Sequence, residues 1–115
     1  MLLVNTSQDG VTFFNSMDEI PTDTKPQKLA MSVVMGYTND KPEGADGEDS
    51  DVTGDDVTRF QMNKEKELAR ENLLQDIASC NGCNAVIIES AQFETINSSA
   101  TAFIIRATLL NVRPA

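Results

Sequence analysis

Histidine is absent from the 115 residues of this sequence. Histidine is the commonest general base and the commonest metal ligand in proteins, so its absence excludes the Ser-His-Asp and Cys-His mechanisms. Catalysis by lysine, aspartate or glutamate stays open chemically, but no motif in the chain indicates it. We therefore expect a protein that is not an enzyme and that uses no cofactor.

Long apolar runs are absent as well. No stretch approaches the roughly 18 to 20 apolar residues of a membrane-spanning helix, which predicts a protein without a membrane span. Residues 1–10 contain no basic segment followed by a long apolar one, so we expect no signal peptide and a cytoplasmic location. A secreted chain trimmed of its leader would show the same pattern, and this alternative stays open.

Basic residues are scarce: 9 lysines and arginines stand against 18 aspartates and glutamates, which gives a net charge of −9. Such a charge repels phosphate backbones and excludes general nucleic-acid binding. Most of it lies in residues 39–56, where eight acids accompany one base, Lys41. This segment has too little apolar surface to offset its ordering entropy, so we expect a mobile acidic loop.

The chain length and the apolar fraction of 40% predict a single domain over residues 1–115. Strand and helix signals predict an α+β fold of ββαββ order, with an antiparallel sheet of about four strands and one long helix packed on one face. Gly36, inside the second strand, indicates a bulge or a close approach of two backbones. The predicted strands are residues 11–15, 29–37, 84–96 and 101–113, and the predicted helix is residues 57–79.

The predicted helix has recognisable ends and one apolar side. Asp55 or Asp56 is the expected N-cap, and Gly82 is the expected left-handed residue after the helix. The side expected to pack on the sheet carries Met62, Ala69, Leu73, Ile77 and Cys80.

The last predicted strand is apolar on both faces. Phe103, Ile105, Ala107 and Leu109 lie on one face, while Ile104, Leu110 and Val112 lie on the other, interrupted by Arg106 and Thr108. One helix covers only one face of a sheet, and a neighbouring subunit is the simplest cover for the second face. We therefore predict a homo-oligomer whose interface contains Ile104, Leu110 and Val112.

Three short segments carry a family resemblance: residues 11–20 (VTFFNSMDEI), residues 33–36 (VVMG) and residues 82–86 (GCNAV). Together with the helix, they resemble the YbjQ-type heavy-metal-binding domain family and the related stress-sensing lipoprotein of the Rcs envelope system. The resemblance implies a compact α+β subunit that assembles into a symmetric oligomer and has no established enzymatic activity. This chain departs from the pattern at Cys83, where the family has alanine, and it lacks the lipoprotein's cysteines. A stress-sensing role therefore does not transfer.

Cys80 and Cys83 form the most specific local motif, a C-x-x-C. Such a pair can be a redox dithiol, half of a zinc site, a local disulfide or two buried structural thiols. The pair follows a helix C-terminus, where the dipole disfavours a thiolate, and the sequence has no second cysteine pair. We favour structural thiols. The alternative is a metal-handling protein with Cys80 and Cys83 as thiolate ligands, in which a second subunit could supply further sulfurs.

The acidic segment partly matches a calcium loop. Asp49, Asp51 and Thr53 occupy its first three ligand positions, and Gly54 occupies the glycine position. A complete loop needs a bidentate glutamate where this chain has Phe60. A solvated loop is therefore the favoured interpretation.

Two further patterns have structural and functional interpretations. Glu89 and Arg106 lie on the two strands of the predicted hairpin, which favours a cross-strand ion pair over a catalytic pair. Tyr37 could line a pocket or simply end its strand. Taken together, the sequence favours a non-enzymatic binding or assembly module that self-associates.

Overall fold

The computed structural model describes residues 10–42, 52–98 and 100–114. One helix and four strands confirm the α+β class, and the helix lies between the second and third strands as expected. Two short elements come first: strand β1 (Thr12–Phe14) and the 3-10 helix η1 (Met17–Glu19). The long elements follow: strand β2 (Thr24–Gly36), helix α1 (Gly54–Ser79), strand β3 (Ala85–Asn97) and strand β4 (Ala100–Pro114).

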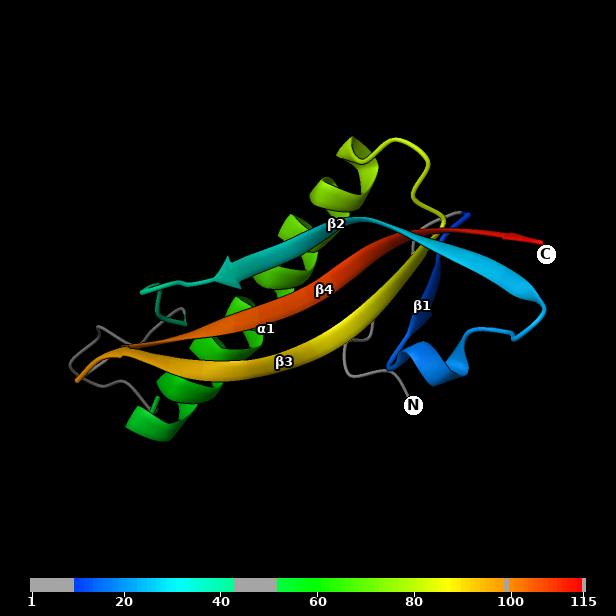
Figure 1. Cartoon of the computed structure of the whole chain (residues 1–115). Coiled ribbons are helices and arrows are strands. Elements are labelled where there is room, and N and C mark those ends of the chain that lie inside the picture. The colour runs from blue at the N-terminus through cyan, green and yellow to red at the C-terminus, as the bar shows by residue number, and fades with distance from the viewer. Residues whose placement is uncertain (1–9, 43–51, 99, 115) are drawn as a thin grey trace.

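The sheet has the strand order β1-β3-β4-β2 and is mixed, which corrects the expectation of an antiparallel sheet. β4 pairs antiparallel with both β2 and β3, whereas β1 runs parallel to β3. The cause is the path of residues 15–23, which does not form a tight turn but carries the chain from one edge of the sheet to the other (Figure 1). β1 and β2 therefore cannot pair with each other.

Helix α1 starts at Gly54 because Thr53 caps it. The Thr53 hydroxyl accepts a hydrogen bond from the Asp56 N–H, and the Asp56 carboxylate accepts one from the Thr53 N–H, both at 3.1 Å. This reciprocal capping box satisfies two amide groups that a helix end otherwise leaves free. The N-cap is thus Thr53, which corrects the expected Asp55 or Asp56. At the other end, Gly82 has φ 84°, the left-handed conformation that was predicted.

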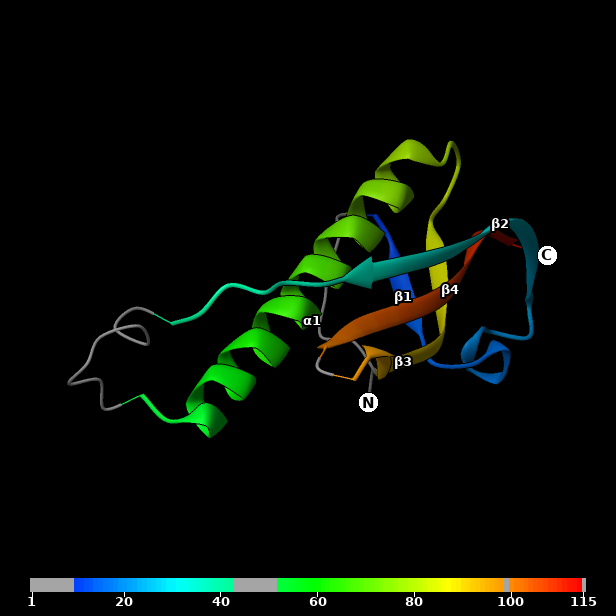
Figure 2. The same ribbon diagram turned by 90° about the vertical axis from the view of Figure 1, so that its left-hand side faces the viewer.

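The main core lies between α1 and one face of the sheet (Figures 1 and 2). Ala69, Leu73 and Ile77, spaced four residues apart, are its buried helical residues. They pack among Val34, Val86, Ile88, Phe103, Ile105, Ala107 and Leu109. The predicted helix-facing residues of the last strand are all in this cluster. A continuous apolar stripe on α1 thus faces a continuous apolar face of the sheet.

A second, smaller cluster lies on the opposite face of the sheet. Ile20 covers Ala85, Ile87 and Leu110, and Phe14 and Val112 pack against them. Leu110 is only 1% exposed, so its own chain covers it. This finding corrects the expectation that Leu110 belongs to a subunit interface.

No helix in the described residues is long and apolar enough to cross a membrane.

Candidate functional site

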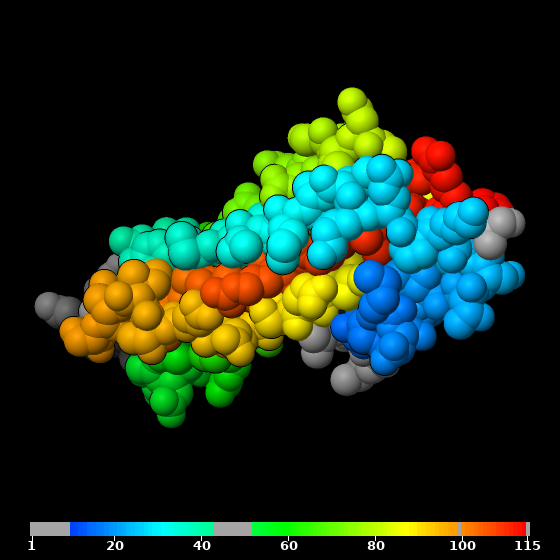
Figure 3. Space-filling view, in the orientation of Figure 1, coloured from blue at the N-terminus to red at the C-terminus, as the bar shows by residue number. Residues whose placement is uncertain are grey.

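Part of the second face of the sheet stays uncovered. Met31, Val33 and Met35 of β2 are 65%, 63% and 52% exposed, while the alternate residues Ser32, Val34 and Gly36 are buried under α1. In the sheet register, Ile104 lies beside Met35, so this predicted interface residue borders the same surface. We call the surface formed by Met31, Val33, Met35 and Ile104 the open face. Figure 3 shows this side of the molecule, with the blue N-terminal residues covering only one end of it.

A charged pair adjoins the open face: Arg106 of β4 lies beside Val33 in the sheet register and pairs with Glu94 of β3. Glu94 accepts hydrogen bonds from Gln92 at 3.3 Å and from Arg106 at 3.2 Å. The hydrogen bond from Gln92 is the main cause that lowers the pKa of Glu94, and the hydrogen bond from Arg106 is the next.

The expected Glu89–Arg106 pair does not form, because an irregularity between Ile88 and Ser90 shifts the strand register. Glu89 instead accepts a hydrogen bond from the Thr108 hydroxyl.

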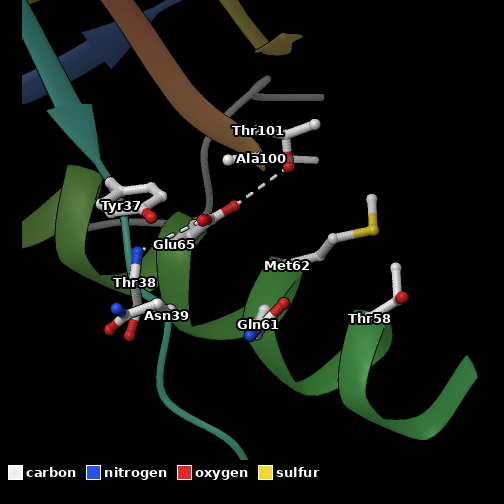
Figure 4. Close-up of a pocket in the computed structure, with 9 residues that line it drawn as sticks. All are labelled: Tyr37, Thr38, Asn39, Thr58, Gln61, Met62, Glu65, Ala100 and Thr101. Atoms are coloured by element: carbon white, nitrogen blue, oxygen red, sulfur yellow. Dashed lines mark hydrogen bonds between the residues drawn. The ribbon is translucent and has the colours of Figure 1, made fainter. Parts of the chain in front are cut away.

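A pocket of about 200 Å³ lies between the first half of α1, the segment that follows β2 and the start of β4 (Figure 4). Its wall contains the buried carboxylate of Glu65, which is 2% exposed. Glu65 Oε2 accepts a hydrogen bond from the Thr38 N–H at 3.2 Å, and Oε1 accepts one from the Thr101 hydroxyl at 3.4 Å. Tyr37 lines the same pocket, which is one of the two roles that the sequence left open for it.

Gly36 is the reason that this pocket can form. A Cβ atom at this position would lie 1.9 Å from the carbonyl oxygen of Glu65 and 2.6 Å from the Ala69 nitrogen. The absence of a side chain therefore lets the end of β2 approach the helix backbone, as one interpretation of the sequence anticipated.

After β2, Asp40 holds the chain on α1. Its carboxylate forms an ion pair with Lys64, and its backbone carbonyl accepts a hydrogen bond from the Gln61 side chain.

The sequence interpretation missed Glu65. It is the one buried charged side chain among the described residues. A signal was present, because Glu65 precedes Ala69, Leu73 and Ile77 at the same four-residue spacing and so shares their face of the helix. An acidic residue on the apolar face of a helix is the sequence pattern that would have identified Glu65.

Cys80 and Cys83 have free thiols, and both are half-buried against the main core. The Cys83 thiol donates to the Ala85 carbonyl at 3.5 Å, and burial raises the pKa of Cys83. Both observations favour structural thiols over reactive thiolates. Residues 10–42, 52–98 and 100–114 contain no cluster of three or more His, Cys, Asp or Glu side chains that is placed to hold a metal ion.

The calcium-loop residues are only partly within the structure. Asp49 and Asp51 lie outside the described residues, as does half of the predicted mobile loop at residues 39–56. Thr53, the third expected ligand, uses its hydroxyl oxygen to cap α1. Its local role is therefore a helix cap.

Comparisons of the chain with protein-family models, with curated proteins and with solved structures found no match. The resemblance to the YbjQ-type family therefore stays a prediction.

Proposed function

We propose that this protein is a non-enzymatic binding module that works as a homo-oligomer, with the open face as its subunit interface. One observation carries the proposal: three apolar side chains of β2, at a period of two, are more than half exposed on a face that the helix does not cover. A contiguous exposed apolar surface with a polar border is typical of a protein–protein interface.

The two halves of β2 differ in a way that supports a contact at its second half. The first half carries Lys25, Pro26 and Lys28, residues that protect an edge strand from pairing with another chain. The second half, from Ala30 to Gly36, has no charged residue. The β2 residues of the open face therefore carry no charge that would oppose packing against an apolar surface.

A second copy of the chain is the occupant that we infer. A two-fold interface places the same patch on both subunits, so the patch must be complementary to itself. The open face meets this condition because its own side chains are uncharged and two of them are flexible methionines. Arg106, which lies beside Val33 in the sheet register, forms an ion pair with Glu94 of the same chain. Two such sheets can pack face to face at a separation of about 10 Å.

Salt dependence distinguishes this occupant from a basic partner. Each copy carries a net charge of −9, so the two copies repel each other outside the interface. Added salt screens that repulsion and strengthens self-association, whereas it weakens binding to a basic protein.

The test is sedimentation velocity on the wild type and on Val33→Glu, over a range of micromolar concentrations and at two salt concentrations. We expect a concentration-dependent oligomer that high salt favours, and a monomer for Val33→Glu because a carboxylate would be buried in an apolar interface. Val33→Thr, which keeps the β-branched shape, should weaken association while preserving the fold.

Gln75→Glu is the matched control, because it adds the same charge at an exposed position of α1. It should associate like the wild type. A wild type that stays monomeric at every concentration and salt level would reject the proposal.

The alternative of a metal-handling protein has less support. Among the described residues it rests on Cys80 and Cys83, and both side chains pack against the core. Zinc prefers four ligands, so this function would require further ligands from a second copy.

A further inference from the structure

The structure assigns a second function to the pocket beside Glu65: we propose that it binds a small organic cation with an ammonium head group, and that Glu65 is the counterion. This site is separate from the open face. It is formed by α1, the segment after β2 and the start of β4.

The first step of the argument is the charge balance at Glu65. Its carboxylate is buried, and its two hydrogen-bond donors, the Thr38 N–H and the Thr101 hydroxyl, are both neutral. Within the described part of the chain, no lysine or arginine forms an ion pair with it. Burial of a carboxylate without a cation is costly, so such an acid is commonly paired with a charge.

The neighbouring lysines are engaged elsewhere. Lys64 forms its ion pair with Asp40, and the Nζ atom of Lys66 lies 5.6 Å from the centroid of the Phe93 ring. Lys64 and Lys66 therefore flank Glu65 in the sequence, but neither lysine pairs with its carboxylate. A bound cation would complete the pair.

The lining of the pocket matches a donor-rich ligand. Thr58, Gln61 and Asn39 contribute neutral polar side chains, and no basic residue is among the described residues that line it. Glu65 is the single charged residue of that lining. The negative charge of Glu65 balances a monovalent cation, and neutral oxygens elsewhere in the lining can accept hydrogen bonds from its N–H groups.

Size and ligand number favour an organic ammonium ion over a divalent metal. Calcium takes six to eight oxygen ligands, usually with several carboxylates, whereas the described residues that line this pocket supply one carboxylate. A pocket of about 200 Å³ is also smaller than a drug-sized ligand site, which occupies roughly 300 to 1,000 Å³. An alkylammonium ion of a few carbon atoms fits both limits.

The experiment uses the full chain and two probes of equal size, propylammonium chloride and 1-propanol, with sodium chloride to match the ionic strength. Backbone amide NMR shifts are followed as each probe is added. We expect propylammonium to shift the Thr38 and Thr101 amides with a dissociation constant on the order of millimolar, because so small a ligand has little contact area. Propanol should leave both amides unchanged.

Glu65→Gln is the matched variant, since glutamine can accept from the Thr38 N–H and donate to the Thr101 hydroxyl. It should fold, with a melting temperature no lower than that of the wild type, and should bind propylammonium at least about tenfold more weakly. Potassium chloride and calcium chloride are added as metal probes.

Each outcome decides the proposal. Equal binding of the two probes to the wild type would overturn it without reference to any variant. Undiminished propylammonium binding by Glu65→Gln, or saturable binding of a metal ion but not of propylammonium, would also overturn it. Self-association measured in parallel reports on the open face independently.

Discussion

At the scale of single residues, Gly36 is the position on which the contact between sheet and helix depends. Its Cα faces the backbone of α1 at Glu65 and Ala69, and the space contains no room for a methyl group. The same close approach brings Thr38 within hydrogen-bond distance of Glu65. One glycine therefore controls both the packing of the helix and the geometry of the pocket.

Replacing Gly36 with alanine should lower the free energy of unfolding by about 2–3 kcal/mol, because the added Cβ would force the strand and the helix apart. Urea denaturation measures this change. Gly54→Ala is the control: nothing lies within 4 Å of a Cβ there, so alanine should leave stability unchanged or raise it through its better helix propensity. Equal losses in the two variants would contradict the role given to Gly36.

At the scale of elements, the capping box decides where α1 begins. Thr53 and Asp56 satisfy each other's backbone amides, and the helix therefore includes Gly54 to Asp56, which the sequence pattern had left outside it. The hydrogen bonds from Thr53, the backbone one first, lower the pKa of Asp56 below its usual value of 3.8. A carboxylate with a depressed pKa stabilises the folded state only while it is ionised.

The sign of the resulting pH dependence follows from that depressed pKa. The contribution of Asp56 is complete above the pKa of the unfolded chain, about 4, and is lost as the pH falls through the lower pKa of the folded state. We expect the free energy of unfolding to decline below about pH 4, and to decline less steeply in Asp56→Asn. Denaturant titrations between pH 2 and 6 measure both slopes.

Asp55→Asn is the control for the capping effect, since Asp55 is exposed in the same turn but does not belong to the capping box. A decline as shallow in Asp55→Asn as in Asp56→Asn would show that general charge, rather than the cap, is responsible.

At the scale of the whole molecule, the two faces of the sheet are covered unequally. Helix α1 covers one face along β2 and β4, while Ile20 and Phe14 cover only one end of the other. The remaining surface presents Met31 and Met35 to solvent. Oxidation to the sulfoxide makes an exposed methionine polar, so the proposed interface should be sensitive to peroxide.

Mild peroxide treatment should therefore weaken the self-association that we propose. Sedimentation before and after oxidation measures the change, and mass spectrometry of peptides confirms which methionines react. A Met31→Leu, Met35→Leu double variant keeps the apolar surface and should associate equally well with and without peroxide. Unchanged association of a wild type oxidised at both positions would place the interface elsewhere.

Local patterns predicted much of the fold. The four-residue spacing of Ala69, Leu73 and Ile77, the alternation from Phe103 to Leu109 and the left-handed Gly82 each depend on nearby residues, and each was predicted correctly. The Glu89–Arg106 pair was not, because a register shift at Glu89 depends on how two strands align along their whole length. Leu110 was misplaced for a similar reason: its cover, Ile20, is distant in sequence.

Hydrophobic periodicity and turn chemistry were sufficient to assign the class, the helix and the hairpin, since those signals act over a few residues. Long-range packing was required to pair β1 with β3, to separate the covered end of the second face from the open face, and to bury Glu65 beside a pocket. These features arise where segments far apart in the chain meet, and no local pattern records which segments those are.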